Sequence, residues 1–127
     1  MKQLAAVLTL AFLALPLPAF AASGLAGTYQ CEGWNPGSAT TAAADYKGSL
    51  VLMDDGNGVR ASWITGDPNN PTKGLGIITN AGGKRLLSIG YNDGTDGGIA
   101  VYEVSADGKT LTGLWGPAGA GHEVNKR

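Results

Sequence analysis

The residues best suited to chemistry are few and far apart in this sequence. His122 is the only histidine and Cys31 the only cysteine, and no Gly-x-Ser-x-Gly motif surrounds any serine. A pair of Cys31 and His122 is geometrically possible, but no further residue pattern supports it as a nucleophile and base. A carboxylate pair for glycoside hydrolysis could come from Glu32, Glu103 or Asp45, although nothing in the sequence selects any of them. We therefore predict that the protein is not an enzyme.

One loop has the composition of a calcium site without its spacing. Residues 92–98 read Asn-Asp-Gly-Thr-Asp-Gly-Gly, whereas an EF-hand needs oxygen-bearing side chains at alternate positions and a bidentate Glu at the twelfth. With Asn92 in the first position, Gly94 occupies the third, which needs a ligand. We interpret this segment as a hairpin turn. One cysteine and one histidine exclude a structural zinc site, and we predict neither a metal nor a cofactor.

Tyrosine and tryptophan side chains are the remaining candidates for a functional site. Each combines an apolar ring with a polar atom, which suits both packing and ligand contact. The candidates for ligand binding are Trp34, Tyr46, Trp63, Tyr91 and Trp115. If Trp34, which lies beside a loop, contacts a partner, replacing it with Ala should weaken binding and leave the melting temperature nearly unchanged. If Trp63 and Trp115 instead fill the core, replacing either with Ala should unfold much of the protein.

The first 21 residues have the three zones of a secretory signal peptide. Lys2 supplies the positive charge, residues 4–15 form an apolar uncharged run, and Ala19 and Ala21 are the small residues of a cleavage site. The run is shorter than the ~20 residues that a membrane-spanning helix needs. We predict a signal helix over residues 1–21 and one mature domain, residues 22–127, of 127 − 21 = 106 residues. The expected location is the periplasm or the medium outside the cell.

The predicted mature domain carries little charge. Loss of Lys2 leaves 9 − 1 = 8 basic residues against 10 acidic ones, a net charge near −2. No basic patch is present to neutralise phosphates, so we expect no nucleic-acid partner, and no segment is suited to a membrane span or surface. The alternation of its strand places Cys31 on the apolar face. We therefore expect a monomer, or a dimer if Cys31 is exposed.

Turn signals divide the mature domain into eight candidate strands. Glycines gather with Asn and Asp at intervals, and Asn-Gly and Asp-Gly supply the positive φ values that tight hairpins require. Residues 38–44 are expected to form a loop, because a helix this short with two adjacent threonines is not stable alone. The strand candidates are Leu25–Glu32, Tyr46–Met53, Val59–Thr65, Gly74–Thr79, Arg85–Tyr91, Ile99–Ser105, Thr110–Gly116 and His122–Asn125.

Short links between alternating segments predict an all-β fold built as an antiparallel meander. About eight strands can remove their exposed edges by closing into an up-and-down barrel of the lipocalin or avidin type, and a two-sheet sandwich is the alternative. An aromatic residue lies two positions from a glycine in Gly27–Tyr29, Tyr46–Gly48 and Gly113–Trp115. We interpret these pairs as places where a ring covers a glycine while the strand bends.

Short glycine-aromatic motifs are spread over most of the mature chain. They are Gly27-Thr28-Tyr29, Asn35-Pro36-Gly37, Tyr46-Lys47-Gly48, Ser62-Trp63-Ile64-Thr65-Gly66, Gly74-Leu75-Gly76-Ile77, Gly98-Ile99-Ala100-Val101-Tyr102 and Leu111-Thr112-Gly113-Leu114-Trp115, followed by Glu123. In these motifs the chain resembles a group of small exported bacterial proteins, common in alphaproteobacteria, labelled uncharacterised or "fibronectin-binding". The resemblance implies attachment to a partner and assigns no individual site residue.

The export signal, the scarcity of catalytic groups and the polar-tipped aromatics together favour a small secreted or periplasmic binding protein. Its expected partner is a protein or a small-molecule ligand. The alternative is a periplasmic hydrolase inhibitor of small β-barrel type, in which the loop Asp67–Thr72 would block the enzyme. A third hypothesis, an enzyme of lipocalin-like architecture, has no residues in its support.

Overall fold

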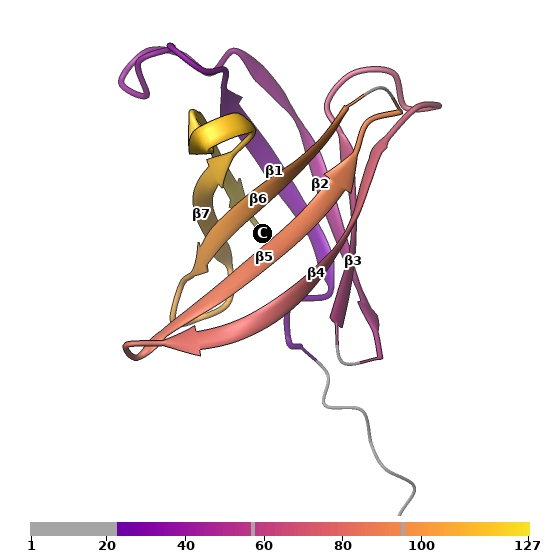
Figure 1. The fold of residues 1–127 in the computed structure, drawn as a ribbon, viewed down its shortest axis with the longest axis vertical. Helices are drawn as coiled ribbons and strands as arrows, with labels where there is room; N and C mark the ends of the chain where they lie inside the picture. Colours follow the sequence, from indigo (N-terminus) through magenta and orange to yellow (C-terminus); the bar gives the residue numbers. More distant parts are fainter. Residues whose placement is uncertain (1–22, 57, 95) are drawn as a thin grey trace, which may run out of the picture.

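A closed antiparallel β-barrel forms the body of the molecule (Figure 1). The computed structural model describes residues 23–56, 58–94 and 96–127, so the predicted signal helix lies outside the described residues. Each strand pairs with its neighbours in chain order, and the last strand also pairs with the first. The strands are β1 (Gly27–Trp34), β2 (Tyr46–Asp55), β3 (Gly58–Ile64), β4 (Thr72–Ala81), β5 (Lys84–Asn92), β6 (Gly97–Val104), β7 (Thr110–Trp115) and β8 (Gly121–Lys126), with a 3-10 turn, η1 (Pro117–Gly119), before β8.

This architecture confirms the predicted meander and barrel, and the two-sheet sandwich is wrong. All eight strand candidates are present with shifted ends. The last one, which runs from Gly121 to Lys126, closes the barrel by pairing with both β7 and β1. Residues 38–44 contain turns and no helix. Within the described part of the chain, no helix is long and apolar enough to cross a membrane.

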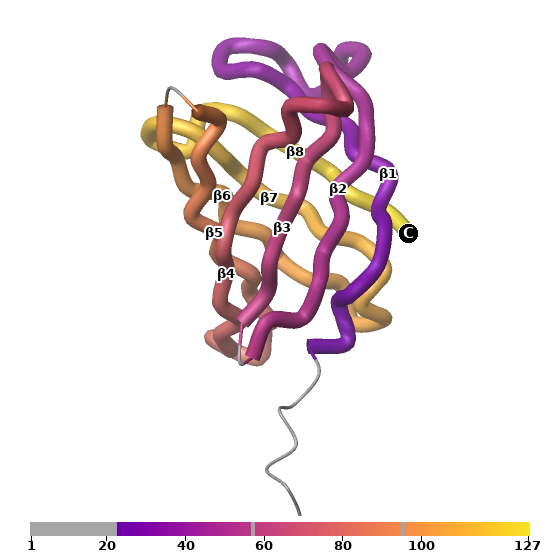
Figure 2. Tube along the Cα trace, turned by 90° about the vertical axis from the view of Figure 1, so that its right-hand side faces the viewer, coloured from indigo at the N-terminus to yellow at the C-terminus, as the bar shows by residue number. Residues whose placement is uncertain are grey.

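The two ends of the barrel differ in their connections (Figure 2). One end carries the tight hairpins, including the β4–β5 turn, where Gly82 and Gly83 take φ values of 57° and 76°, as a type I′ turn requires. Residues 23–26 lie across this same end, where Leu25 is fully buried. The Arg127 guanidinium donates hydrogen bonds to the carbonyls of Ala26 (2.8 Å) and Gly24 (2.7 Å). This end is therefore covered, and the longer loops surround the opposite end.

Strand alternation places the apolar residues inside the barrel. In β3, Val59, Ala61 and Trp63 are buried while Arg60 is exposed, as predicted from the sequence. Cys31 is also buried, with 1% of its surface exposed. The core comprises Leu25, Tyr29, Cys31, Leu50, Leu52, Val59, Ala61, Trp63, Leu87, Ile89, Ala100, Tyr102, Val104 and Leu111. Apolar packing fills the covered end of the barrel interior. An interior pocket is therefore expected toward the loop end.

Aromatic rings cover glycines of the neighbouring strand. The prediction that each ring covers a glycine two positions away on its own strand is wrong. The directly paired residues are Tyr46 with Gly33, Tyr91 with Gly98, and Trp115 with Gly121. A methyl group added to any of these three glycines would overlap the facing ring. Directly opposed residues are closer than residues two positions apart on one strand. This spacing explains why the covering ring comes from the neighbouring strand, a register that the sequence alone does not reveal.

Replacing Gly113 with Ala is expected to destabilise the barrel. A Cβ atom there would overlap the Val101 carbonyl oxygen and lie 2.8 Å from the Tyr102 Cα, so the backbone itself would have to move. Overpacking of this kind lowers the free energy of unfolding by about 1–3 kcal/mol. Urea unfolding measures the change. Gly90→Ala is the control, because Gly90 is in β5 with open space around its Cα. Equal losses in the two variants would contradict the packing argument.

Candidate functional site

A pocket of about 410 Å³ lies inside the barrel at the loop end. Its volume is within the range of about 300–1,000 Å³ that small-molecule sites occupy. Asn35, Thr65, Thr72 and Asp93 contribute to its lining from the loop ends of the strands. Deeper in the barrel, the buried residues Trp63, Ala100, Tyr102 and Glu123 also line it. The pocket is therefore the part of the barrel interior that the apolar core leaves unfilled.

Four of the five aromatic residues predicted to bind a ligand line this pocket. They are Tyr46, Trp63, Tyr91 and Trp115. The rings form two edge-to-face pairs, Trp63 with Tyr91 at a centroid distance of 5.8 Å and Tyr46 with Trp115 at 6.2 Å. Such pairs add about 0.5–1.5 kcal/mol beyond the buried area. The strand order brings together residues from β2, β3, β5 and β7, which the sequence could propose only one at a time.

The carboxylate of Glu123 lies in the pocket with 4% of the residue exposed. Its Oε1 accepts hydrogen bonds from Trp63 Nε1 (3.0 Å), Tyr102 Oη (2.8 Å) and Asn125 Nδ2 (3.0 Å). Its Oε2 accepts a hydrogen bond from Tyr46 Oη at 2.7 Å. Four neutral donors therefore stabilise a buried negative charge, an arrangement that offsets the large penalty of removing a carboxylate from water.

Glu123 and Tyr102 were not among the predicted site residues. The candidate strand that contained Glu123 was the shortest. Its place in the barrel depends on pairing with both β1 and β7. The alternation in β8 did carry a signal, because Gly121, Glu123 and Asn125 face inward. Two polar side chains on the inner face of a closing strand need partners, and inward-facing tyrosines and tryptophans are suitable donors.

Burial and the charge of Glu123 keep the groups around it protonated. Desolvation is the largest effect on Cys31, Tyr46 and Tyr102, and the nearby Glu123 charge adds to it, so the pKa of each group is raised. A raised pKa leaves Cys31 with little thiolate at neutral pH, which makes it a poor nucleophile. The two tyrosine hydroxyls remain hydrogen-bond donors.

Trp34, the fifth candidate for ligand binding, does not line this pocket. It is 8% exposed, and its Nε1 donates a 3.0 Å hydrogen bond to the carbonyl of Ala42 in the loop that follows β1. Its ring lies edge-to-face with His122 at 5.7 Å. Trp34 and His122 are paired residues on the outer face of the barrel, whereas Cys31 is on the inner face. Cys31 and His122 therefore do not meet.

The carboxylates weighed for hydrolysis lie outside the pocket. Glu32 and Glu103 are exposed and paired with Lys47 (3.5 Å) and Lys84 (3.3 Å). Asp45 accepts a 2.7 Å hydrogen bond from the Asn35 backbone N–H, and hydrogen bonding lowers the pKa of its carboxyl group. These three side chains do not converge on one site.

β5 and β6 pair as far as Asn92 and Gly97, as the predicted hairpin turn between them requires. The Gly94 N–H donates to Asn92 Oδ1 and the Asp96 N–H to Asp93 Oδ1, both at 2.7 Å. One side-chain oxygen each of Asn92 and Asp93 thus accepts a bond from the local backbone, as in ordinary Asx turns. Among residues 23–56, 58–94 and 96–127, no group of three or more His, Cys, Asp or Glu side chains could hold a metal ion.

The fold and pocket define a small closed β-barrel with a ligand-sized cavity at one end. No family model matches the chain, and no curated protein matches it. The resemblance to small exported bacterial proteins therefore stays a prediction.

Proposed function

We propose that this protein is an exported, non-catalytic binding protein that holds a small molecule in the pocket at the loop end of its barrel. The observation that carries the proposal is a cavity of about 410 Å³ lined by Tyr46, Trp63, Tyr91 and Trp115 around the buried carboxylate of Glu123. A concave apolar surface with a few convergent polar groups is typical of ligand sites. Protein interiors are close-packed, so in a barrel that binds no ligand we expect larger side chains to fill this space.

The state of the polar groups supports binding more than catalysis. Glu123 is held by four donors, and proton transfer through it would require breaking hydrogen bonds of 2.7–3.0 Å. The raised pKa of Cys31 disfavours a nucleophilic thiolate, and His122 is on the outer face. A general base must reach the proton it removes, and a nucleophile must be activated by a neighbour. These groups instead hold one another in place.

The walls of the pocket are also rigid before any ligand arrives. Tyr46, Tyr91 and Trp115 are each seated against a glycine of the next strand. Tyr46 is further held by Glu123, and Trp115 Nε1 donates to the carbonyl of His122 at 3.4 Å. Binding to such a preformed surface loses little side-chain entropy, which favours affinity.

Ligand binding can be tested with the three tryptophan indole N–H groups as reporters. A fragment library of neutral, anionic and cationic compounds is added to ¹⁵N-labelled protein, and indole resonances are followed by NMR. We expect binders to shift Trp63 and Trp115, which line the pocket, and to leave Trp34 unchanged on the outer face. Trp34 is therefore an internal control within the same spectrum.

Substitutions assign the shifts to the pocket. Trp115→Phe should reduce fragment affinity, because it removes part of the wall while keeping an aromatic ring over Gly121. Leu114→Ser is the matched control, since Leu114 is the preceding residue of β7, faces outward and is 49% exposed. The proposal fails if no fragment moves the Trp63 or Trp115 resonance, or if both variants weaken binding equally.

A further inference from the structure

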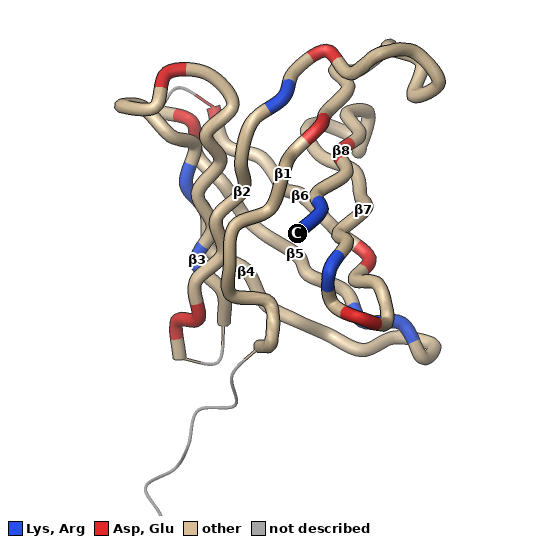
Figure 3. The backbone as a smooth tube through the Cα atoms, turned by 180° about the vertical axis from the view of Figure 1, so that it is seen from behind, with Lys and Arg blue, Asp and Glu red and all other residues tan. Residues whose placement is uncertain are grey.

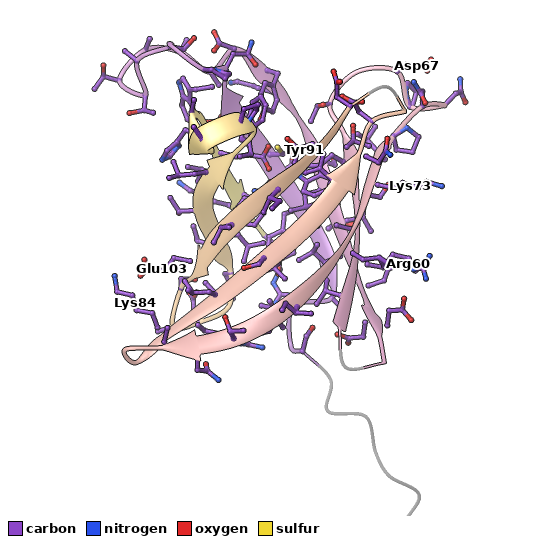
Figure 4. The ribbon with its side chains drawn as sticks, in the orientation of Figure 1. Arg60, Asp67, Lys73, Lys84, Tyr91 and Glu103 are labelled. Atoms are coloured by element: carbon purple, nitrogen blue, oxygen red, sulfur yellow. The ribbon has the colours of Figure 1, made fainter. Side chains whose placement is uncertain are left out.

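The charge of the pocket distinguishes among classes of small ligand. Two of its lining residues, Glu123 and Asp93, are acidic, and none of the described lining residues is Lys, Arg or His. Figure 4 shows Arg60, Lys73 and Lys84 projecting away from the barrel, and Figure 3 shows acidic residues in the loops at the pocket end. Because a low-dielectric wall weakens screening, this charge favours a cation and disfavours an anion.

Glu123 has little capacity left to accept hydrogen bonds from a ligand. Its Oε1 accepts bonds from Trp63, Tyr102 and Asn125, and its Oε2 accepts one from Tyr46. An ionised carboxylate offers about four lone-pair sites. A primary ammonium group carries three N–H donors and could place only one of them on the remaining lone pair of Oε2, so it would have to displace a partner to place the others on Glu123. A cation without N–H donors would need no such displacement.

We propose that the pocket takes an organic cation whose positive charge is carried by a methylated nitrogen, such as a trimethylammonium group. This inference rests on the proposed function, because it names the ligand class of the same pocket. Glu123 supplies the opposite charge, and Tyr46, Trp63, Tyr91 and Trp115 supply apolar surface and π electrons around it. Methylated ammonium groups bind to aromatic side chains through cation–π attraction and need no hydrogen-bond acceptor.

The outer part of the pocket suits the remainder of such a molecule. Asn35, Thr65 and Thr72 provide an amide and two hydroxyls toward the loop end. These groups can both donate and accept hydrogen bonds, so a hydroxyl or another neutral polar group attached to the cation would be accommodated. The volume of about 410 Å³ leaves room for this second part beside a trimethylammonium group.

Three probes of similar size test the inference on the full mature domain. Choline has a trimethylammonium group, 3,3-dimethyl-1-butanol replaces its nitrogen with carbon and is neutral, and ethanolamine has a primary ammonium group. Affinities come from titration calorimetry and from the Trp63 and Trp115 indole resonances. We expect choline to bind at least about tenfold more tightly than either of the other probes, as desolvated cation–π and charge attraction predict.

A pair of charge-removing variants locates the selectivity. Glu123→Gln keeps the shape of the side chain and should remove most of the preference for choline over 3,3-dimethyl-1-butanol. Glu103→Gln removes an exposed carboxylate of the outer face, paired with Lys84, and should leave that preference unchanged. Circular dichroism and thermal melts show whether each variant is folded. The wild-type comparison of the three probes decides the inference even if Glu123→Gln does not fold.

The outcomes separate this inference from the proposed function. If 3,3-dimethyl-1-butanol or ethanolamine binds as tightly as choline, the proposed preference for a methylated cation is wrong, and the pocket is still a ligand site. The same conclusion holds if fragments shift the two indole resonances but choline does not. If neither fragments nor the three probes bind, both the ligand class and the proposed function are wrong.

Discussion

Raising the pH from 9 to 11 is expected to lower the free energy of unfolding by about 4 kcal/mol through Cys31 and Tyr102. In the unfolded chain these groups ionise near their ordinary pKa values of 9.0 and 10.0, whereas burial and Glu123 raise both pKa values in the folded barrel. Above pH 9 the unfolded state therefore holds fewer protons than the folded state, and stability falls as the pH rises. Below about pH 8 both states are protonated and the effect is absent.

Urea unfolding at pH 8, 9, 10 and 11 measures this loss. A decrease of about 4 kcal/mol is a large part of the 5–15 kcal/mol that stabilises a typical domain. Cys31→Ser retains a hydrogen-bond donor beside Glu123 but removes the thiol ionisation, so its stability should fall less between pH 9 and 10. A stability that stays constant up to pH 11 would be inconsistent with the protonated, buried network around Glu123.

Trp63→Ala is expected to lower the free energy of unfolding by about 3–5 kcal/mol. Trp63 is 6% exposed, packs against Tyr91 and donates to Glu123, so the substitution leaves a cavity and removes one donor from a buried charge. Trp115 is only partly buried at the loop end, and Trp115→Ala should have a smaller effect. Chemical denaturation of the two variants gives both values.

Trp63→Phe separates the ring from its hydrogen bond. It keeps an aromatic side chain beside Tyr91 and removes the Nε1 donor, so its loss should approach the 1.5–3 kcal/mol of a hydrogen bond to a charged group. A loss under about 1 kcal/mol for Trp63→Ala would mean that the barrel can collapse around the missing ring, contrary to the rigid packing described above.

The barrel could be predicted from the sequence because its determinants are local. Asn-Gly and Asp-Gly clusters mark the turns, and alternation such as Val59-Arg60-Ala61 marks the inner and outer faces. The ring-on-glycine pairs could not be assigned correctly. Tyr46 covers Gly33 only because β1 and β2 pair in one register, and a register is a property of two strands together.

The sequence predicted which residue types form the candidate site. It predicted less well which individual residues belong to it. Tyr46, Trp63, Tyr91 and Trp115 were chosen for their chemistry, and the closed barrel places all four in one pocket. Trp34 has the same chemistry but lies on the outer face, beneath the loop that contains Ala42. Glu123 was missed because its environment consists of donors from four strands, and none of them is near it in sequence except Asn125.

The pairing of β1 with β8 has a consequence for the order in which the chain can fold. The pair Trp34–His122 joins residues 122 − 34 = 88 positions apart. Until β8 has been synthesised, β1 and β7 each have an unpaired edge, and Glu123 is missing from the cluster of its donors. Final closure of the barrel must therefore wait for β8, and contacts of such long range make this step slow. A chain truncated before β8 would expose the unpaired backbone edges of β1 and β7, which favours its aggregation.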